Sequence, residues 1–220
     1  MESLTFKPTN KARLLLGLLS FLIILFLLLA FFVATHPPSA IDLAVSSAIQ
    51  RNHTPLMDQV MTLISWFGHT SVAIAMVLIT SALFYIFKYR RESLLILLAF
   101  ASGLINSVIK IIVNRPRPTK ELVRIVEIAK HESFPSGHTV FYTVFFGFLL
   151  MMMVHLKTIV SPIRFTVIAV CAFMISSIPF SRIYLGAHWF TDVTGGLILG
   201  MIYLILLRLL YLRSYLSEEK

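Results

Sequence analysis

The feature that most constrains this chain is the apolar stretch Leu14–Val33, which runs for twenty residues without a charged side chain. At about 1.5 Å per residue, a helix of this length crosses the ~30 Å hydrocarbon layer of a bilayer. Only 13% of the residues are charged, whereas about a quarter are charged in a typical soluble domain. The chain is therefore expected to be an integral membrane protein.

Further apolar runs predict an all-α fold, a bundle of six transmembrane helices in a single domain covering residues 1–220. The predicted spans are residues 13–34, 70–88, 93–113, 138–156, 163–180 and 190–212. Between the first two, residues 41–49 have amphipathic spacing behind a capping box formed by Ser39 and Asp42, and Pro55 is placed to open a second short helix. We interpret both segments as short interfacial helices, with a loop packed on the bundle as the alternative.

Basic residues at the ends of the spans predict the orientation. With the N-terminus inside, eleven lie on the inner side against five on the outer side, once Lys110, Arg117 and Arg182 are assigned to a candidate site. Both termini are then cytoplasmic, and Trp66 and Trp189 fall in an outer aromatic belt. The inner set is Lys7, Lys11, Arg13, Lys88, Arg90, Arg91, Lys157, Arg164, Arg208, Arg213 and Lys220. The chain has a net charge of +9, but its basic residues are not interleaved with aromatic residues as on a nucleic-acid surface. No nucleic-acid partner is therefore predicted.

Three polar blocks interrupt the apolar pattern. They are Lys110–Pro118 at the end of the third span, Phe134–His138 at the start of the fourth, and Ser181–Asp192 between the fifth and sixth. Because successive spans cross the membrane in opposite directions, all three blocks are expected on the same, extracytoplasmic side. Ionisable groups within spanning helices are costly and usually functional. The motif-bearing core of the chain is therefore residues 93–212.

The blocks contain the donors of an anion site. Lys110, Arg117 and Arg182 are cations without an adjacent acidic partner in the sequence, and the arginine fork matches phosphate oxygens. Ser136 and Gly137 open a helix, where free backbone N–H groups and the helix dipole favour an anion. This set predicts a cradle for a phosphoryl group.

The blocks also contain the groups of a nucleophilic mechanism. His188 and Asp192 are four residues apart, so the carboxylate lies on the same helix face and can orient the imidazole for attack. His138 comes from another helix and can protonate the departing oxygen. The other nearby carboxylates are loop residues Glu121, Glu127 and Glu132, so no metal site is predicted.

In this order, Lys-x6-Arg-Pro, Pro-Ser-Gly-His and Ser-Arg-x5-His-x3-Asp resemble the motifs of the type 2 phosphatidic acid phosphatase (PAP2) family. The resemblance implies a metal-independent membrane phosphatase without a cofactor. It implies that His188 forms a phosphohistidine, that His138 protonates the leaving group and that Asp192 supports His188. The residues that would hold the phosphoryl oxygens are Lys110, Arg117, Ser136, Gly137 and Arg182.

The resemblance extends to compact bacterial enzymes of the cell envelope, and among their substrates it favours undecaprenyl pyrophosphate. Phosphatidylglycerophosphate and phosphatidic acid are the alternatives, and the oligomeric state is left open. A lipid phosphotransferase is the alternative within the family, because an alcohol can intercept a phosphohistidine. An anion transporter is the rival from another class, and the largely apolar run Phe145–Val154 offers it no polar path.

Three features outside the motifs carry weaker predictions. Arg115 is interpreted as a lipid-headgroup contact or a structural charge. Residues 119–132 have apolar spacing that predicts a short surface helix over the site. Gly196 and Gly200 are one helical turn apart, which is typical of close helix packing in membranes.

Overall fold

The structure is a computed structural model that describes residues 10–36 and 38–218. Lys7 and Lys220, two of the charges behind the predicted orientation, lie outside the described residues. Within them the regular elements are helices and there is no strand. The helices are α1 (Asn10–Thr35), α2 (Ala40–Gln50), α3 (Pro55–Trp66), α4 (Thr70–Ile86), α5 (Arg90–Leu97), α6 (Ala99–Val113), α7 (Gly137–His155), α8 (Ser161–Tyr184) and α9 (Phe190–Glu218).

The predicted all-α transmembrane fold is confirmed. In the part of the chain that the structure describes, five helical segments are long and apolar enough to cross a membrane, with α5 and α6 forming one of them. A sixth span is reached when α3 and α4 are taken together, although the pair is bent by 52°. The five segments are Arg13–Thr35, Arg90–Val113, Gly137–His155, Ser161–Tyr184 and Phe190–Tyr211.

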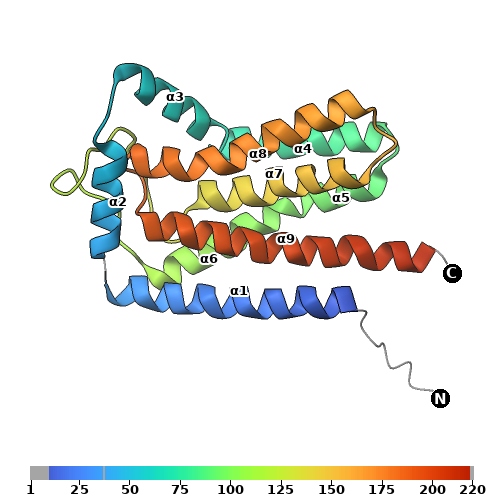
Figure 1. The fold of residues 1–220 in the computed structure, drawn as a ribbon, viewed down its shortest axis with the longest axis horizontal. Coiled ribbons are helices and arrows are strands. Elements are labelled where there is room, and N and C mark those ends of the chain that lie inside the picture. The colour runs from blue at the N-terminus through green and yellow to red at the C-terminus, as the bar shows by residue number, and fades with distance from the viewer. Residues whose placement is uncertain (1–9, 37, 219–220) are drawn as a thin grey trace, which may run out of the picture.

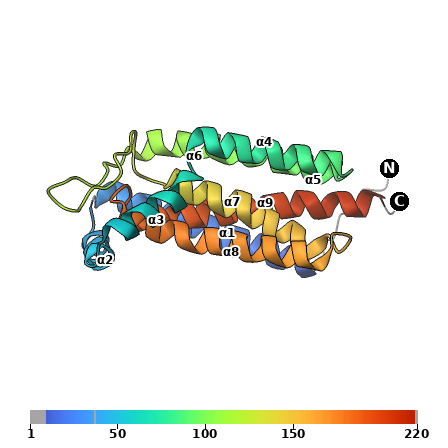
Figure 2. The same ribbon diagram turned by 90° about the horizontal axis from the view of Figure 1, so that it is seen from above.

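The long helices lie side by side, and α2 lies across the end of the bundle where α1 ends and α9 begins (Figure 1). Seen from above, α4, α5 and α6 run along one side, and α1, α7, α8 and α9 make up the rest (Figure 2). Helix α7 packs against α6, α8 and α9, while α1 packs against α9 and α3 against α8. The three polar blocks therefore meet at the end of the bundle covered by α2.

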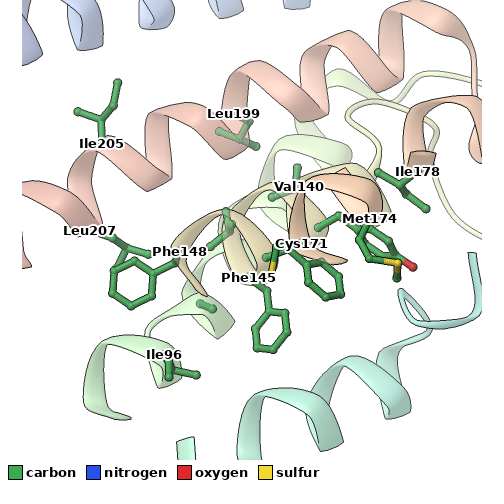
Figure 3. Packing of buried hydrophobic residues seen from close by; sticks show 14 of the residues in the cluster. Ile96, Val140, Phe145, Phe148, Cys171, Met174, Ile178, Leu199, Ile205 and Leu207 are labelled. Carbon is green, nitrogen blue, oxygen red and sulfur yellow. The ribbon is translucent and has the colours of Figure 1, made fainter. Parts of the chain in front are cut away.

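Helix α7 lies in the middle of the core. Its side chains Val140, Phe145 and Phe148 pack with residues of α8 and α9, among them Cys171 and Leu199 (Figure 3). Apolar burial adds little in lipid, so close contact and dispersion hold such helices together.

The glycines of α9 permit this contact, as the sequence predicts. A Cβ atom on Gly200 would lie 2.5 Å from the Cβ of Thr143, and one on Gly196 would lie 2.9 Å from the Cβ of Thr139.

Both predicted short helices are present. Helix α2 begins with a complete capping box, in which the Ser39 side chain accepts from the Asp42 N–H and the Asp42 carboxylate accepts from the Ser39 N–H. Helix α3 has Pro55 in its first turn, and its capping residue Thr54 accepts from the Met57 N–H. Helix α2 packs on the ends of α8 and α9.

Two expectations are wrong. Residues 119–132 form turns and extended chain instead of a surface helix, because the Val126 and Glu127 N–H groups both donate to the Leu185 carbonyl. Trp189 is only 1% exposed and donates its indole N–H to the Pro116 carbonyl, so it is a core residue and not part of an aromatic belt.

Candidate active site

The polar blocks line one open cavity of about 1310 Å³. Two of the eight predicted residues, Ser136 and Asp192, are fully buried and are absent from its lining. The other six line the cavity: Lys110, Arg117, Gly137, His138, Arg182 and His188.

Left-handed backbone turns follow α6 and α8, so Arg117 and His188 lie beyond the ends of these helices. Helix α6 stops at Asn114, which has a left-handed φ of 46°, a conformation that asparagine tolerates well. Gly186 has a φ of +68° where the chain turns from α8 towards His188, and a Cβ there would lie 3.1 Å from the backbone carbonyl carbon of Arg124. Glycine is needed at this turn both for its φ and for its small size.

Backbone carbonyls hold two of the predicted cations in place. The Lys110 ammonium donates to the carbonyls of Glu132 and Ser133. Arg117 donates to the carbonyls of Lys130 (2.9 Å), His131 (2.7 Å) and Ala187 (2.6 Å). Carbonyls orient a cation without cancelling its charge. Burial and the neighbouring Arg182 lower the pKa of Arg117 to about 10, and it remains charged at neutral pH.

Arg182 has an acidic partner that the sequence analysis did not expect. Its Nη1 donates to the Glu127 carboxylate at 2.8 Å and also to the Ser65 hydroxyl. The Nε of Arg182 is buried without a partner among the described residues. Glu127 belongs to the loop that crosses the site, 55 positions away in sequence, which is why no local pattern reveals the pair.

His188 is 2% exposed and is held between an acid and a base. Its Nδ1 lies 3.5 Å from Asp192 Oδ2 and 3.4 Å from the Ser133 hydroxyl. Its Nε2 lies 3.3 Å from Arg117 Nη1, which can only donate, so Nε2 carries the lone pair and Nδ1 the proton. Burial, followed by the charges of Arg117, Arg182 and Lys110, holds the pKa of His188 well below its usual range. The imidazole is therefore neutral and able to attack an electrophile.

His138 faces the same cavity from α7, and its Nε2 has no hydrogen-bond partner among the described residues. Its ring meets the His69 ring edge-on, with centroids 5.9 Å apart. Gly68 lies directly against it, since a Cβ on Gly68 would come within 2.8 Å of the His138 Cγ. Gly68 could not be predicted as part of the site, because no motif surrounds it in the sequence.

One group of residues at the cavity could hold a cation, although no metal site was expected. His69, Glu127 and His138 each offer a ligand atom, and these atoms lie within 4.8 Å of one another. However, Glu127 is already paired with Arg182, and the neighbouring basic side chains repel a further cation. The ligand atoms are therefore of types that bind metals, but the positive charges around them disfavour a bound cation.

Asp192 belongs to a buried ionic network. Arg115 donates to Asp192 at 2.5 Å and to Asp42 at 2.6 Å, and all three side chains are fully buried. Asp192 also accepts from the Trp189 N–H at 2.8 Å and from the Ser133 hydroxyl. The interpretation of Arg115 as a structural charge is confirmed, and the lipid-headgroup alternative is wrong. The role of Ser133 was not predicted, although its position directly before the second polar block is a signal that it belongs to the site.

The expectation for Ser136 is only half met. It lies at the start of α7, but its N–H donates to the Asp192 carbonyl at 3.0 Å, and its hydroxyl accepts from Thr139 at 3.0 Å. Its backbone N–H is therefore not free for a substrate, whereas Gly137 lines the cavity.

Residues 91–215 match the family model of the PAP2 superfamily. The chain belongs to this superfamily. Phosphatidylglycerophosphatase B of Bacillus subtilis is 29% identical over 85% of this chain and 91% of its own length. Lipid phosphate phosphatase delta of Arabidopsis thaliana is 28% identical over 68% of this chain and 33% of its own length.

Solved structures share the fold. The crystal structure of the transmembrane PAP2-type phosphatidylglycerolphosphate phosphatase from Bacillus subtilis has a TM-score of 0.78 at 28% identity, covering 89% of this chain and 96% of that chain. LpxE of Aquifex aeolicus has a TM-score of 0.61 at 24% identity, covering 78% and 97%, and shows the likeness of fold alone. This PAP2 member is therefore a multi-helix membrane protein of a phosphatase family.

Proposed function

We propose that the chain hydrolyses a lipid phosphate through a phosphohistidine on His188, without a metal ion. The shape of the cavity carries this proposal. One part is lined by basic side chains and the two histidines, and another by apolar residues of α4 and α6 such as Ile74 and Leu104, which are 41% and 71% exposed on the helix surfaces. A phosphorylated headgroup can thus occupy the polar part while its chains remain in lipid.

The proposed reaction has two steps. The Nε2 lone pair of His188 attacks phosphorus and the bond to the lipid oxygen breaks, while protonated His138 gives its proton to that oxygen. The negative charge of the bound phosphate favours the protonated form of His138. Water then attacks the phosphohistidine and returns a proton to His138, and the N–P bond breaks to release inorganic phosphate.

The basic side chains supply the electrostatic part of this mechanism. Lys110 and Arg117 have fixed orientations before the substrate binds, so little reorganisation is needed in the transition state. Arg182 would exchange part of its interaction with Glu127 for a phosphoryl oxygen. Gly137 would allow the phosphate to approach the first turn of α7 closely.

For the substrate we propose a glycerolipid phosphate, with phosphatidylglycerophosphate first. The support is the phosphatidylglycerophosphatase name of the Bacillus subtilis relative, which aligns over 91% of its length. Undecaprenyl pyrophosphate, favoured by the sequence analysis, becomes the alternative to be tested beside it. A phosphotransferase would use the same first step with an alcohol in place of water.

The test is phosphate release by purified protein in detergent with EDTA present. The panel comprises phosphatidylglycerophosphate, phosphatidic acid and undecaprenyl pyrophosphate, with His188→Ala as the control. We expect release that survives EDTA and is inhibited by vanadate, with phosphatidylglycerophosphate having the highest kcat/KM. Activity that disappears with EDTA and returns with a divalent cation would refute the metal-free mechanism, and His69→Ala would then test the His69–Glu127–His138 group.

We further propose that the site faces the extracytoplasmic side and that both termini are cytoplasmic, on the basic residues at the ends of the spans. In a Cys171→Ala background, a cysteine replacing Lys130 beside the cavity should react in intact cells with an impermeant maleimide. A cysteine replacing Arg90, at the start of α5, should react only after permeabilisation. The reverse pattern would place the site in the cytoplasm.

A further inference from the structure

We infer that Asp42, on the crossing helix α2, is a positioning residue for the reaction. It holds Arg115 and the first turn of α9 so that Asp192 can orient His188. The inference rests on the proposed role of His188. It assigns a part of the active site to a segment that lies outside all three polar blocks and outside the matched residues 91–215.

The carboxylate of Asp42 is saturated with donors. Its Oδ2 accepts from Arg115 Nη2 at 2.6 Å and from the Ser39 hydroxyl at 2.7 Å. Its Oδ1 accepts from the Thr191 N–H at 2.9 Å and the Thr191 hydroxyl at 2.8 Å. Thr191 lies in the first turn of α9, directly before Asp192, so Asp42 caps the helix that carries Asp192.

Arg115 connects the two acids. Its Nη1 donates to Asp192 at 2.5 Å and to the Thr191 hydroxyl at 2.6 Å, while its Nη2 is committed to Asp42. One guanidinium thus bridges two carboxylates that are both fully buried. Removing one carboxylate from such a buried ion network is strongly destabilising, because it leaves a buried charge less well compensated.

Because the Arg115 guanidinium binds both Asp42 and Asp192, it occupies only one carboxylate oxygen of Asp192. Asp192 Oδ1 accepts from Arg115. Asp192 Oδ2 accepts from the Trp189 N–H and the Ser133 hydroxyl, and it faces His188. Without the Asp42 carboxylate, both amino groups of Arg115 can turn to Asp192 and compete for Oδ2. The imidazole of His188 would then lose its fixed orientation, whereas the basic side chains that hold the substrate would be unaffected.

The experiment is Asp42→Asn, which keeps the shape of the side chain and removes its charge. We expect kcat to fall on the order of 10²-fold, as for a small misplacement of a reacting group, with little change in KM or in vanadate inhibition. Asp58→Asn is the matched control, because Asp58 also pairs with an arginine (Arg124, 2.5 Å) at this end of the bundle but has no contact with Asp192. That variant should retain its kcat.

A second control separates positioning from the capping of α2. Ser39→Ala removes the other half of the capping box and one donor to Asp42 Oδ2, but leaves Arg115 and Thr191 bonded to the Asp42 carboxylate. If Asp42 served only to start α2, Ser39→Ala would reproduce the loss in kcat, and the inference would be overturned. We expect it to keep most of the wild-type kcat.

The decisive measurement repeats Asp42→Asn in an Asp192→Asn background. If Asp42 acts through Asp192, the second substitution should add less than about a twofold loss, because coupled residues are not additive. A full second loss would overturn the inference. Should Asp42→Asn fail to fold, Thr191→Val provides the same cycle with a smaller change, since it removes one contact to Asp42 and one to Arg115. Failure of the proposed function itself would be recognised separately, by activity that persists in His188→Ala.

Discussion

Helices α1 and α7 are both long and apolar, yet they occupy opposite environments. Of the apolar window that marks each span, 11% is buried within the protein in α1 and 61% in α7. The more apolar helix is the less buried one, because in a bilayer the solvent is itself apolar. Hydropathy therefore predicts insertion but not position in the bundle, whereas polar groups within a span mark the centre.

The two helices also differ in how their ends are used. Exposed His36 directly follows the end of α1, and among the described residues it hydrogen-bonds to Thr35 and Phe32 of that last turn. Helix α7 begins at Gly137, and its second residue, His138, lines the same cavity as His188. If this contrast is correct, substitutions at the centre should affect catalysis and those on α1 should not.

The largest effect is expected at His188. Replacement by alanine removes the attacking nitrogen, so turnover should fall by roughly 10⁴- to 10⁶-fold, and no acid-labile phosphoenzyme should form. The measurement is phosphate release together with trapping of ³²P-labelled protein after acid-free denaturation. His36→Ala is the matched control on α1 and should keep wild-type activity. A phosphoenzyme that persists in His188→Ala would show that another residue is the nucleophile.

The sequence predicts the membrane spans and the place where the polar blocks meet. The spans are predictable because the bilayer thickness sets the length of an apolar run, and every apolar residue in that run adds to its hydropathy. The meeting of the three polar blocks at one end follows from the alternating direction of the spans. The sequence alone therefore predicts that His138 and His188 lie in a common site.

Other features depend on contacts between distant segments and have no local pattern. Asp42 was correctly assigned to a capping box, but its bond to Thr191 joins residues 149 positions apart. Arg115 and Arg117 are two positions apart, yet one enters a buried ion network and the other lines the cavity. Residues 119–132 have helical spacing but bond to the Leu185 carbonyl instead, because tertiary contacts override weak local preference.

A smaller and substrate-dependent effect is expected at His138, where the ring contacts the leaving group but not phosphorus in the proposed mechanism. His138→Ala should lower kcat on phosphatidic acid by about 10²- to 10⁴-fold, because a lipid alkoxide needs a proton as it leaves. On an activated aryl phosphate the loss should be much smaller. Asp192→Asn should impair both substrates alike through His188. An equal loss on both substrates in His138→Ala would contradict its assignment as the general acid.

The smallest effect concerns packing and uses glycine to compare α9, beside α7, with α1. Gly200→Ala would place a Cβ 2.5 Å from the Thr143 Cβ, so α7 and α9 must move apart, at a cost of about 1–3 kcal/mol. Gly17→Ala on α1 meets no atom within 4 Å, so it should leave stability unchanged or raise it by up to about 1 kcal/mol, since alanine favours a helix over glycine. The measurement is the midpoint of thermal unfolding in one detergent. Because the added methyl group is the same in both variants, a difference in stability isolates helix contact from lipid contact. Equal midpoints would mean that the α7–α9 contact accommodates the added methyl group at Gly200 as easily as lipid does at Gly17. The distinction between a packed centre and a lipid-facing periphery would then not hold at this contact.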